Sequence, residues 1–216
     1  MWLALALVVS YLLGSIPISV WLGKATRGID IREHGSGNAG ATNAFRVLGL
    51  KAGLLVLVLD MAKGLLAVLL VSKIAEPSCT TDINMIRVLT GGCAIVGHIF
   101  SIFLSFRGGK GVGTGAGVLF ALAPIITLCV LILWIIIVVI TRYISLASMA
   151  AAVCVPVLMA FEKLALGSDP GRALISFGAV LAIVVLISHH ANIRRLLAGT
   201  ENKFTLRRSG SPRKSS

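Results

Sequence analysis

The sequence predicts an all-α polytopic membrane protein with seven transmembrane helices, its N-terminus outside the cell and its C-terminus in the cytoplasm. Of the 216 residues, 57% are hydrophobic and only 13% are charged, whereas about a quarter of the residues in a soluble domain are charged. The charges cluster, and several runs between them reach the roughly 20 apolar residues that cross a hydrocarbon core about 30 Å thick. The net charge of +12 fits basic cytoplasmic loops, which fix the orientation of such proteins.

The first predicted span covers residues 1–22, with no basic residue before it and two soon after it. A signal peptide has the opposite bias, so this segment reads as a retained helix whose N-terminus is outside. A polar, Gly-rich loop follows at 24–46, and the second span runs over 47–74. Within it Asp60 and Lys63 stand three residues apart, which favours a mutual pair that faces the helix bundle.

A polar loop at 75–84 leads to the third span, 86–106, which contains His98. We expect a structural hydrogen bond for this histidine. The next uncharged stretch, 111–141, has 31 residues and would be about 46 Å long as one helix. That length exceeds one span, and Pro124 can divide it into two shorter helices.

The last two predicted spans are 143–166 and 172–189, which makes seven in all. With the break at Pro124, the basic tail ends in the cytoplasm, as the positive-inside rule requires. Of the 20 Lys and Arg residues, four then lie outside, one lies within a span and 15 lie inside. We expect one transmembrane domain, 1–204, and a disordered Ser/Arg/Lys-rich tail, 205–216.

The sequence supports neither nucleic-acid binding nor a disulfide, metal or cofactor site. No nucleic-acid-binding motif accompanies the positive charge. The four cysteines form no C-x-x-C pair, so we expect neither a disulfide framework nor a metal site, and no cofactor. They are Cys79, Cys93, Cys129 and Cys154.

The first loop carries the segment Gly-Ser-Gly-Asn-Ala-Gly-Ala-Thr-Asn at 35–43, with Arg46 one turn later. Its glycine spacing matches the dinucleotide fingerprint, but that fingerprint has meaning only after a strand, and here a membrane helix precedes it. Bare glycine N–H groups can still approach an anion closely. We therefore favour a phosphate-binding loop over a flexible connection between helices.

The second loop reads Arg-Gly-Gly-Lys-Gly-Val-Gly-Thr at 107–114, with Lys110 between glycines. It lacks the first glycine of a P-loop, and a glycine follows the lysine, so hydrolysis of a nucleoside triphosphate is not expected. A lysine charge among glycines suits a phosphate. A loop that serves only the positive-inside bias is the alternative.

The third candidate element lies at the end of the last span. His189 and Asn192 share a face if the helix continues, although a histidine at a helix C-terminus often serves only the helix dipole. Arg142 and Ser145 fall on the same side of the membrane by this map. Three separate segments thus supply anion-binding groups to one face, and this convergence is the main argument from the residues themselves.

At these motifs the chain resembles the bacterial acyl-phosphate:glycerol-3-phosphate acyltransferases of the membrane. The resemblance runs from residue 1 to about 203, and it includes His-x-x-Asn-Ile-x-Arg-Leu-x-x-Gly-Thr-Glu at 189–201. Gly113 stands where the family usually has alanine, and His190 and Ala191 where it often has Arg-Glu.

The resemblance implies a seven-helix enzyme of the bacterial inner membrane, surrounded by lipids, with its active site facing the cytoplasm. It implies transfer of a fatty acyl group from acyl phosphate to the 1-hydroxyl of glycerol 3-phosphate, giving lysophosphatidic acid early in phospholipid synthesis. The catalytic positions carried over are Ser36, Arg46, Lys110, Ser145, His189 and Asn192. The substrate-binding positions are Gly35, Gly37, Asn38, Gly40, Thr42, Asn43, Gly108, Gly109, Gly111 and Glu201.

Both implied substrates are anions, so cations are needed to bring them together. The His and Asp five positions apart that another acyltransferase class uses do not occur here. Either a phosphate oxygen of the donor or His189 takes the proton of the attacking hydroxyl. A transporter for phosphorylated metabolites is the alternative function, although it would want binding groups near the bilayer midplane.

Overall fold

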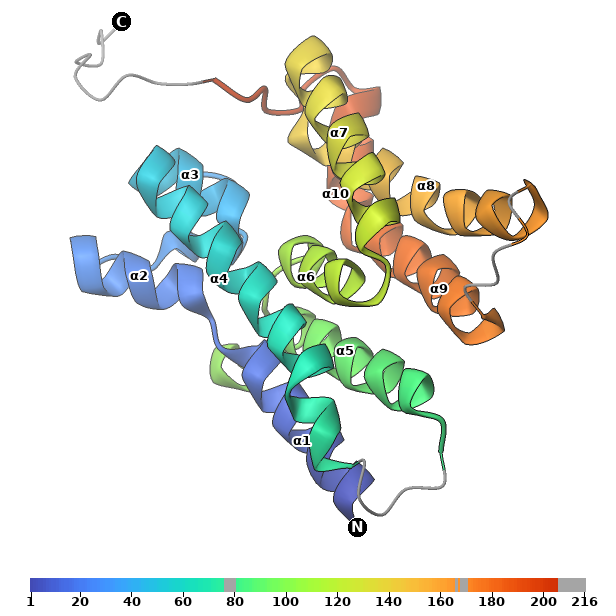
Figure 1. Ribbon diagram of the computed structural model, residues 1–216. Helices are drawn as coiled ribbons and strands as arrows, with labels where there is room; N and C mark the ends of the chain where they lie inside the picture. Colours follow the sequence, from blue (N-terminus) through green and yellow to red (C-terminus); the bar gives the residue numbers. More distant parts are fainter. Residues whose placement is uncertain (76–80, 166, 168–170, 206–216) are drawn as a thin grey trace, which may run out of the picture.

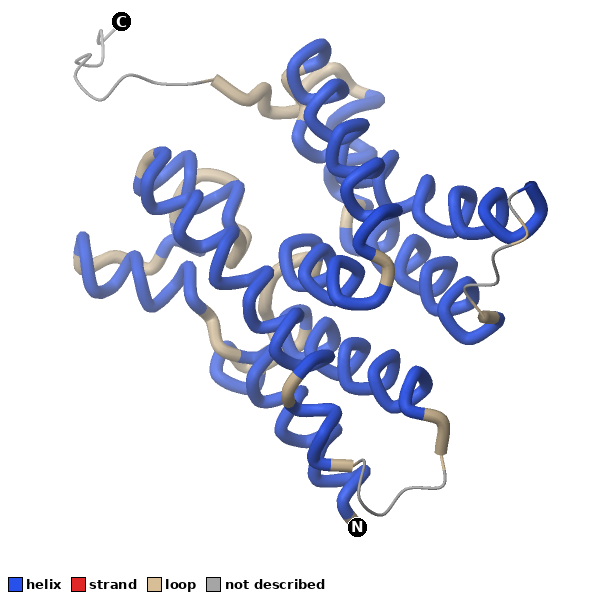
Figure 2. The backbone as a smooth tube through the Cα atoms, in the orientation of Figure 1, coloured by secondary structure: helices blue, strands red, loops and turns tan. Residues whose placement is uncertain are grey.

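The computed structural model describes residues 1–75, 81–165, 167 and 171–205, and these residues form helices joined by short turns, with no strand among them (Figures 1 and 2). Cys79 and the tail from residue 206 lie outside the described residues. In chain order the α-helices are α1 (Trp2–Ser15), α2 (Ile18–Arg27), α3 (Ala41–Leu48), α4 (Leu50–Leu69), α5 (Ile83–Ile99), α6 (Val112–Leu122), α7 (Pro124–Thr141), α8 (Ile144–Ala165), α9 (Arg172–Ser188) and α10 (His190–Leu197), with short 3-10 turns η1 (Ile31–Glu33), η2 (Val71–Ile74) and η4 (Ile102–Leu104).

The described part of the chain holds five helical segments that are long and apolar enough to cross a membrane, or six if α9 and α10, bent by 60°, form one span. The predicted division at Pro124 is confirmed, because α6 ends at Leu122 and Pro124 opens α7. With 11 residues, α6 is about 16 Å long, roughly half of a hydrocarbon core.

The first span and the loop after it differ from the prediction of one helix over 1–22 followed by a loop over 24–46. The helix is interrupted at Ile16 and Pro17, since proline has no N–H to donate to the preceding turn. It resumes as α2 and continues to Arg27. The predicted loop 24–46 therefore contains the end of α2, the turn η1 and most of α3.

Glycines bring pairs of helices into close contact. A Cβ on Gly14 of α1 would overlap the backbone of Ala94 in α5, and a Cβ on Gly97 would overlap Tyr11 in return. Gly64 of α4 and Gly117 of α6 are packed against each other's helix in the same way. Small residues allow membrane helices to approach until their backbones touch, and here they place the short α6 directly against α4.

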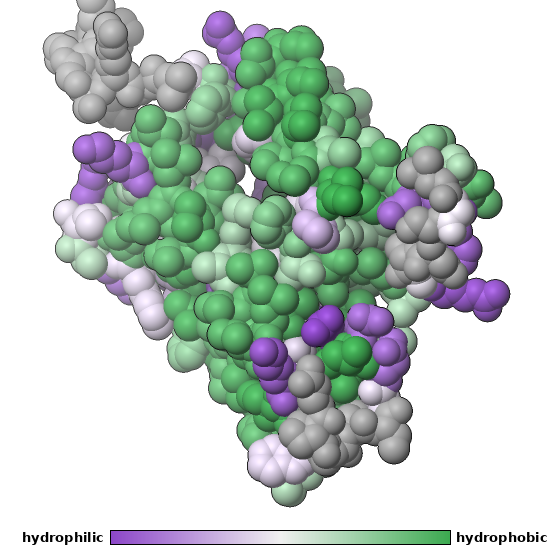
Figure 3. Space-filling model, in the orientation of Figure 1, coloured by the Kyte–Doolittle hydropathy of each residue, from purple (hydrophilic) through white to green (hydrophobic). Residues whose placement is uncertain are grey.

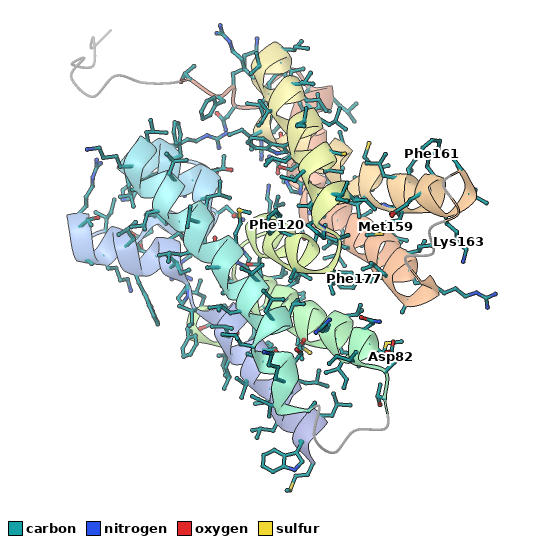
Figure 4. The ribbon with its side chains drawn as sticks, viewed as in Figure 1. Asp82, Phe120, Met159, Phe161, Lys163 and Phe177 are labelled. Carbon is teal, nitrogen blue, oxygen red and sulfur yellow. The ribbon has the colours of Figure 1, made fainter. Side chains whose placement is uncertain are left out.

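Apolar side chains fill the space between the helices and also cover much of the outside. Met159 of α8 is fully buried, and Phe177 of α9 packs against the same core cluster (Figure 4). Large apolar side chains such as Ile125, Val139 and Ile140 are more than 70% exposed, and the face in Figure 3 is mostly hydrophobic. An apolar outer surface suits contact with lipid chains.

A buried polar cluster crosses the first half of the bundle. The predicted pair is confirmed: Lys63 Nζ lies 2.9 Å from Asp60 Oδ1, and both side chains are buried. Lys63 also donates to the Ile16 carbonyl, 3.2 Å away, at the break between α1 and α2. His98 has the expected structural hydrogen bond, with Nδ1 3.0 Å from Thr114 Oγ1. The same His98 nitrogen lies 3.6 Å from Asp60 Oδ1. The cluster therefore links α1, α4, α5 and α6 next to the loop that carries Lys110.

Candidate active site

The loop at 34–40 is shaped by the side chain of Asn43. Its amide donates to the carbonyls of Ile31 (2.7 Å) and His34 (3.1 Å), and its oxygen accepts from the Ser36 N–H (2.8 Å). Both amide hydrogens are thus used inside the protein, so Asn43 builds the loop. The backbone φ at Gly35 is +64°, a left-handed conformation that favours glycine.

The loop leads directly into α3, whose N-terminus is open to an anion. Helix N-termini present unpaired N–H groups and a partial positive charge, and Gly40 caps α3 without a side-chain hydrogen bond. Arg46 stands in the last turn of this helix and donates through Nη2 to the Asn202 carbonyl, 3.3 Å away. Burial lowers the pKa of Arg46, although its ordinary value is so high that the guanidinium stays charged.

The glycines of the second loop allow close packing against the end of α5. The N–H groups of Gly108 and Gly109 donate to the carbonyls of Ile99 (2.9 Å) and His98 (3.0 Å). A Cβ on either glycine would overlap the backbone or ring of His98. These two N–H groups are therefore paired with α5, which differs from the predicted role of holding phosphate.

A chain of hydrogen bonds links Lys110 to four other polar side chains. Lys110 Nζ donates to Asn192 Oδ1. The Asn192 amide donates to Glu201 Oε1 at 2.7 Å, and Ser145 Oγ donates to the same oxygen at 2.8 Å. Arg195 Nε donates to Glu201 Oε2 at 2.6 Å. Side chains from α8 and α10 thus donate directly to the buried Glu201 carboxylate, and Lys110 is linked to it through Asn192.

The charges of this cluster influence one another. Burial lowers the pKa of Lys110 to about 8, with Arg195 and Arg46 adding to the effect and Glu201 opposing it. Burial works to raise the pKa of Glu201, but hydrogen bonds from Asn192, Ser145 and Arg195 outweigh it, so the pKa lies below its ordinary value. Three cations around one carboxylate leave a net positive site. Such a site favours anionic ligands.

His189 lies at the 60° bend between α9 and α10, where its side chain is buried. Its Nδ1 is 2.8 Å from the Val185 carbonyl, which can only accept, so Nδ1 carries the hydrogen. A neutral His189 then presents Nε2 as an acceptor. Asn192 is buried one turn further along α10.

Comparison with known proteins identifies the family. A family model described as glycerol-3-phosphate acyltransferase matches residues 4–199. A glycerol-3-phosphate acyltransferase of Chlorobium phaeobacteroides (strain BS1) is 44% identical, with 93% of this chain and 96% of the relative covered. The chain belongs to the glycerol-3-phosphate acyltransferase family. A relative of the same description from Salinibacter ruber (strain DSM 13855 / M31) is 42% identical, with 95% of this chain and 94% of the relative covered.

Two solved structures are also similar to this chain. Both are crystal structures of PlsY (YgiH), described as an integral membrane glycerol 3-phosphate acyltransferase. Its glycerol 3-phosphate form has a TM-score of 0.81 at 35% identity, and its lysophosphatidic acid form has 0.79 at 34%. Each comparison covers 94% of this chain and 96% of the other. This acyltransferase is therefore an integral membrane enzyme.

The structure brings together five of the six predicted catalytic residues, with Glu201 from the predicted substrate-binding set. Lys110, Asn192, Ser145 and Glu201 share one hydrogen-bonded chain, and His189 lies within electrostatic range of Lys110. Arg46 joins the group through the residue next to Glu201. The two glycine loops also meet, since a Cβ on Gly109 would lie against the Ala39 carbonyl.

Other members of the predicted set lie outside that chain. Ser36 is exposed on the first loop, together with Gly35 and Gly37, while Asn38, Gly40 and Thr42 are half-buried. Gly111 has a left-handed φ of +78° and is the N-cap residue of α6. Sequence reasoning missed Arg195 and Asn202. A signal for Arg195 existed, because Glu201 is the one acidic residue after Asp169 in a strongly basic segment and needs a partner.

Within the described ranges, no three His, Cys, Asp or Glu side chains are grouped so that they could hold a metal ion. The groups present are instead ammonium, guanidinium, amide, hydroxyl and imidazole. These suit the binding of phosphate and the positioning of a hydroxyl.

Proposed function

We propose that the chain transfers a fatty acyl group from acyl phosphate to the 1-hydroxyl of glycerol 3-phosphate, giving lysophosphatidic acid and phosphate. The hydrogen-bonded chain from Lys110 through Asn192 and Glu201 to Ser145 carries the proposal, because it gathers the polar motifs around a net positive charge. The names of the relatives and of the PlsY structures supply the acceptor and the product.

The bound phosphates are the centre of the mechanism. The Arg46 guanidinium can donate two parallel hydrogen bonds to one phosphate, and Lys110 supplies a compact charge between the two substrates. We assign Ser36, Ser145, Asn192 and the open N-terminus of α3, with Thr42, to hydrogen bonds that complete the site. The remaining loop residues, among them Asn43, Gly108 and Gly109, hold the backbone in place.

In the acyl transfer the 1-hydroxyl oxygen attacks the carbonyl carbon, and the bond from that carbon to the phosphate oxygen breaks. The hydroxyl proton passes to an oxygen of the leaving phosphate, which departs as inorganic phosphate. Nε2 of His189 can accept a hydrogen bond from the attacking hydroxyl and so orient it. The same geometry supports the alternative, in which His189 itself takes the proton.

We propose seven membrane crossings, with the N-terminus outside, a single domain over 1–204 and the site facing the cytoplasm of a bacterial inner membrane. Lys110 and Ser145 share one hydrogen-bonded chain, so they lie on one side, and α6 and α7 between them must cross as a pair. In this proposal α6, which is about half as long as the core is thick, crosses together with the loop before it. The same argument supports α4 and α5 as a pair between Arg46 and Lys110. It also supports α8 and α9 as a pair of crossings. Helices α1 and α2 together form one further crossing, which gives seven in all.

The deciding experiment supplies purified enzyme with glycerol 3-phosphate and one donor at a time. We expect turnover with acyl phosphate, and robust turnover with acyl-CoA alone would contradict the proposal. Lys110→Ala should lower kcat/KM by two to three decades, about 2–4 kcal/mol. Lys73→Ala is the matched control: this exposed lysine lies in η2, beyond the end of α4, and its loss should leave kcat/KM unchanged.

A further inference from the structure

Residues 201–205 form a C-terminal strap across the active site. The chain leaves α10 through Gly199, whose φ of +66° ends the helix, and the Thr200 N–H donates to the Arg195 carbonyl at 2.8 Å. From Glu201 onward it follows neither helix nor strand. The strap lies beyond residue 199, where the match to the family model ends.

One side of the strap is fastened to the C-terminal half of the protein. The Glu201 carboxylate is buried among the hydrogen bonds of the site. The Phe204 N–H donates to the Arg142 carbonyl, 2.6 Å away, at the turn between α7 and α8. The Lys203 ammonium lies 5.7 Å from the centre of the Tyr143 ring, a cation–π distance.

The other side of the strap contacts α3 in the N-terminal half. The Phe204 and Phe45 ring centres are 4.7 Å apart, with the rings tilted by 35°. The Asn202 carbonyl accepts from Arg46 Nη2 at 3.3 Å. Phe45 is backed by α4, because a Cβ on Gly53 would overlap its backbone. The strap therefore meets a rigid part of α3 at two adjacent residues.

The partner that the strap gives to Arg46 is a neutral carbonyl. Arg32 shows the contrast: its guanidinium donates three hydrogen bonds from Nε and Nη2 to the Asp30 carboxylate, which offsets its charge. A carbonyl orients the Arg46 side chain without neutralising it. The Glu201 carboxylate also acts on the charge of Arg46, but it is hydrogen-bonded to Arg195. A side chain ordered in advance loses less conformational freedom when the ligand binds.

We propose that Phe204 is a positioning residue, which packs on Phe45 and keeps the Asn202 carbonyl where it orients Arg46 for the phosphate of glycerol 3-phosphate. The inference rests on the proposed function. In the proposed function Arg46 binds the phosphate in the ground state as well as during acyl transfer, so loss of the Phe204 ring should weaken binding of this substrate.

The experiment measures binding and turnover separately on full-length protein in detergent. Titration calorimetry with glycerol 3-phosphate alone gives Kd, and steady-state assays with acyl phosphate give KM and kcat. We expect Phe204→Ala to raise both Kd and KM about tenfold while kcat changes by less than about threefold. Phe204→Tyr keeps the ring and should stay within about twofold of the unsubstituted enzyme.

Phe45→Ala tests the same contact from the other side, and the double variant should bind about as weakly as either single variant. Phe161→Ala is the matched control, since this exposed ring lies on α8 far from the strap (Figure 4). A Kd and KM for Phe204→Ala equal to those of the unsubstituted enzyme, or fully additive effects of the two alanines, would overturn the inference.

The two proposals fail in different ways. A shifted Kd in an enzyme that does not use acyl phosphate would reject the donor and keep the strap. Normal turnover with an unshifted Kd for Phe204→Ala would reject the strap and keep the function. Should Phe204→Ala not elute as a monodisperse peak, Phe204→Leu, which keeps apolar bulk without the ring, takes its place with the same expected direction.

Discussion

At the scale of single residues, Lys110 should set the alkaline limit of the enzyme. Its pKa is lowered to about 8, first by burial and then by Arg195 and Arg46, and only the protonated amine attracts phosphate. We therefore expect kcat/KM to fall by up to about tenfold per pH unit as the pH rises through about 8. The acceptor's phosphate loses its last proton near pH 6, so it does not produce this decline.

The matched variant for this prediction is Lys110→Arg. A guanidinium stays charged throughout the range, so the alkaline decline should disappear even if the rate is lower. The measurement is a profile of kcat/KM from pH 6 to about 10 for both proteins. An unsubstituted enzyme whose kcat/KM stays flat to the end of that range would show that Lys110 is not the titrating group.

The roles of some site residues could be predicted from the sequence, and the roles of others could not. A lysine between glycines and an Asn one turn beyond a histidine indicate anion chemistry, and the structure places both in one hydrogen-bonded chain. Gly108 and Gly109 were expected to offer N–H groups, yet these groups pair with α5. A glycine needed for close approach and a glycine needed for a ligand look the same in sequence, because both depend on what lies opposite.

At the scale of elements, α4 depends on its buried ion pair. Asp60→Asn would leave the Lys63 ammonium buried without a carboxylate, which typically costs about 3–5 kcal/mol. We expect a clearly lower apparent Tm for this variant in detergent, measured by thermal unfolding. Adding Lys63→Met removes the unpaired ammonium, so the double variant should recover most of the lost apparent Tm.

Asp82→Asn is the control for the ion pair. Asp82 is exposed at the start of α5 (Figure 4), and its side chain makes no capping hydrogen bond, so its apparent Tm should stay near that of the unsubstituted protein. Equal apparent Tm values for Asp60→Asn and Asp82→Asn would mean that the pair contributes nothing to α4.

Local chemistry predicts some breaks between elements and not others. Pro124 divides α6 from α7 as expected, because proline favours the first turn of a helix. Pro17 interrupts the first span for the same chemical reason, although apolar content alone suggested one helix over 1–22. The 60° bend at His189 has no proline or glycine, so packing around the buried site decides it.

At the scale of the molecule, the site joins parts of the chain that are far apart in sequence. Arg46 contacts Asn202, and Lys110 contacts Asn192, so both halves of the bundle converge on the residues after α9. The positive-inside rule, applied to the sequence, predicted that these segments lie on one face of the membrane. The strap could not be predicted from the sequence, because residues 201–205 have no periodic pattern. Their partners lie on α3, α8 and α10 and at the turn between α7 and α8.

The orientation of the whole molecule can be tested with single cysteines in a background without Cys79, Cys93, Cys129 and Cys154. Thr205 of the strap follows Phe204, whose ring contacts Phe45 of α3. Lys73 belongs to η2, which follows the end of α4 that is farther from α3. Both side chains are exposed. Because basic residues concentrate on the side of the site, the positive-inside rule predicts that Thr205 faces the cytoplasm. An impermeant maleimide should therefore label Lys73→Cys in spheroplasts and label Thr205→Cys only after lysis. Labelling of Thr205→Cys from outside, with Lys73→Cys protected, would reverse the orientation and place the site on the outer face.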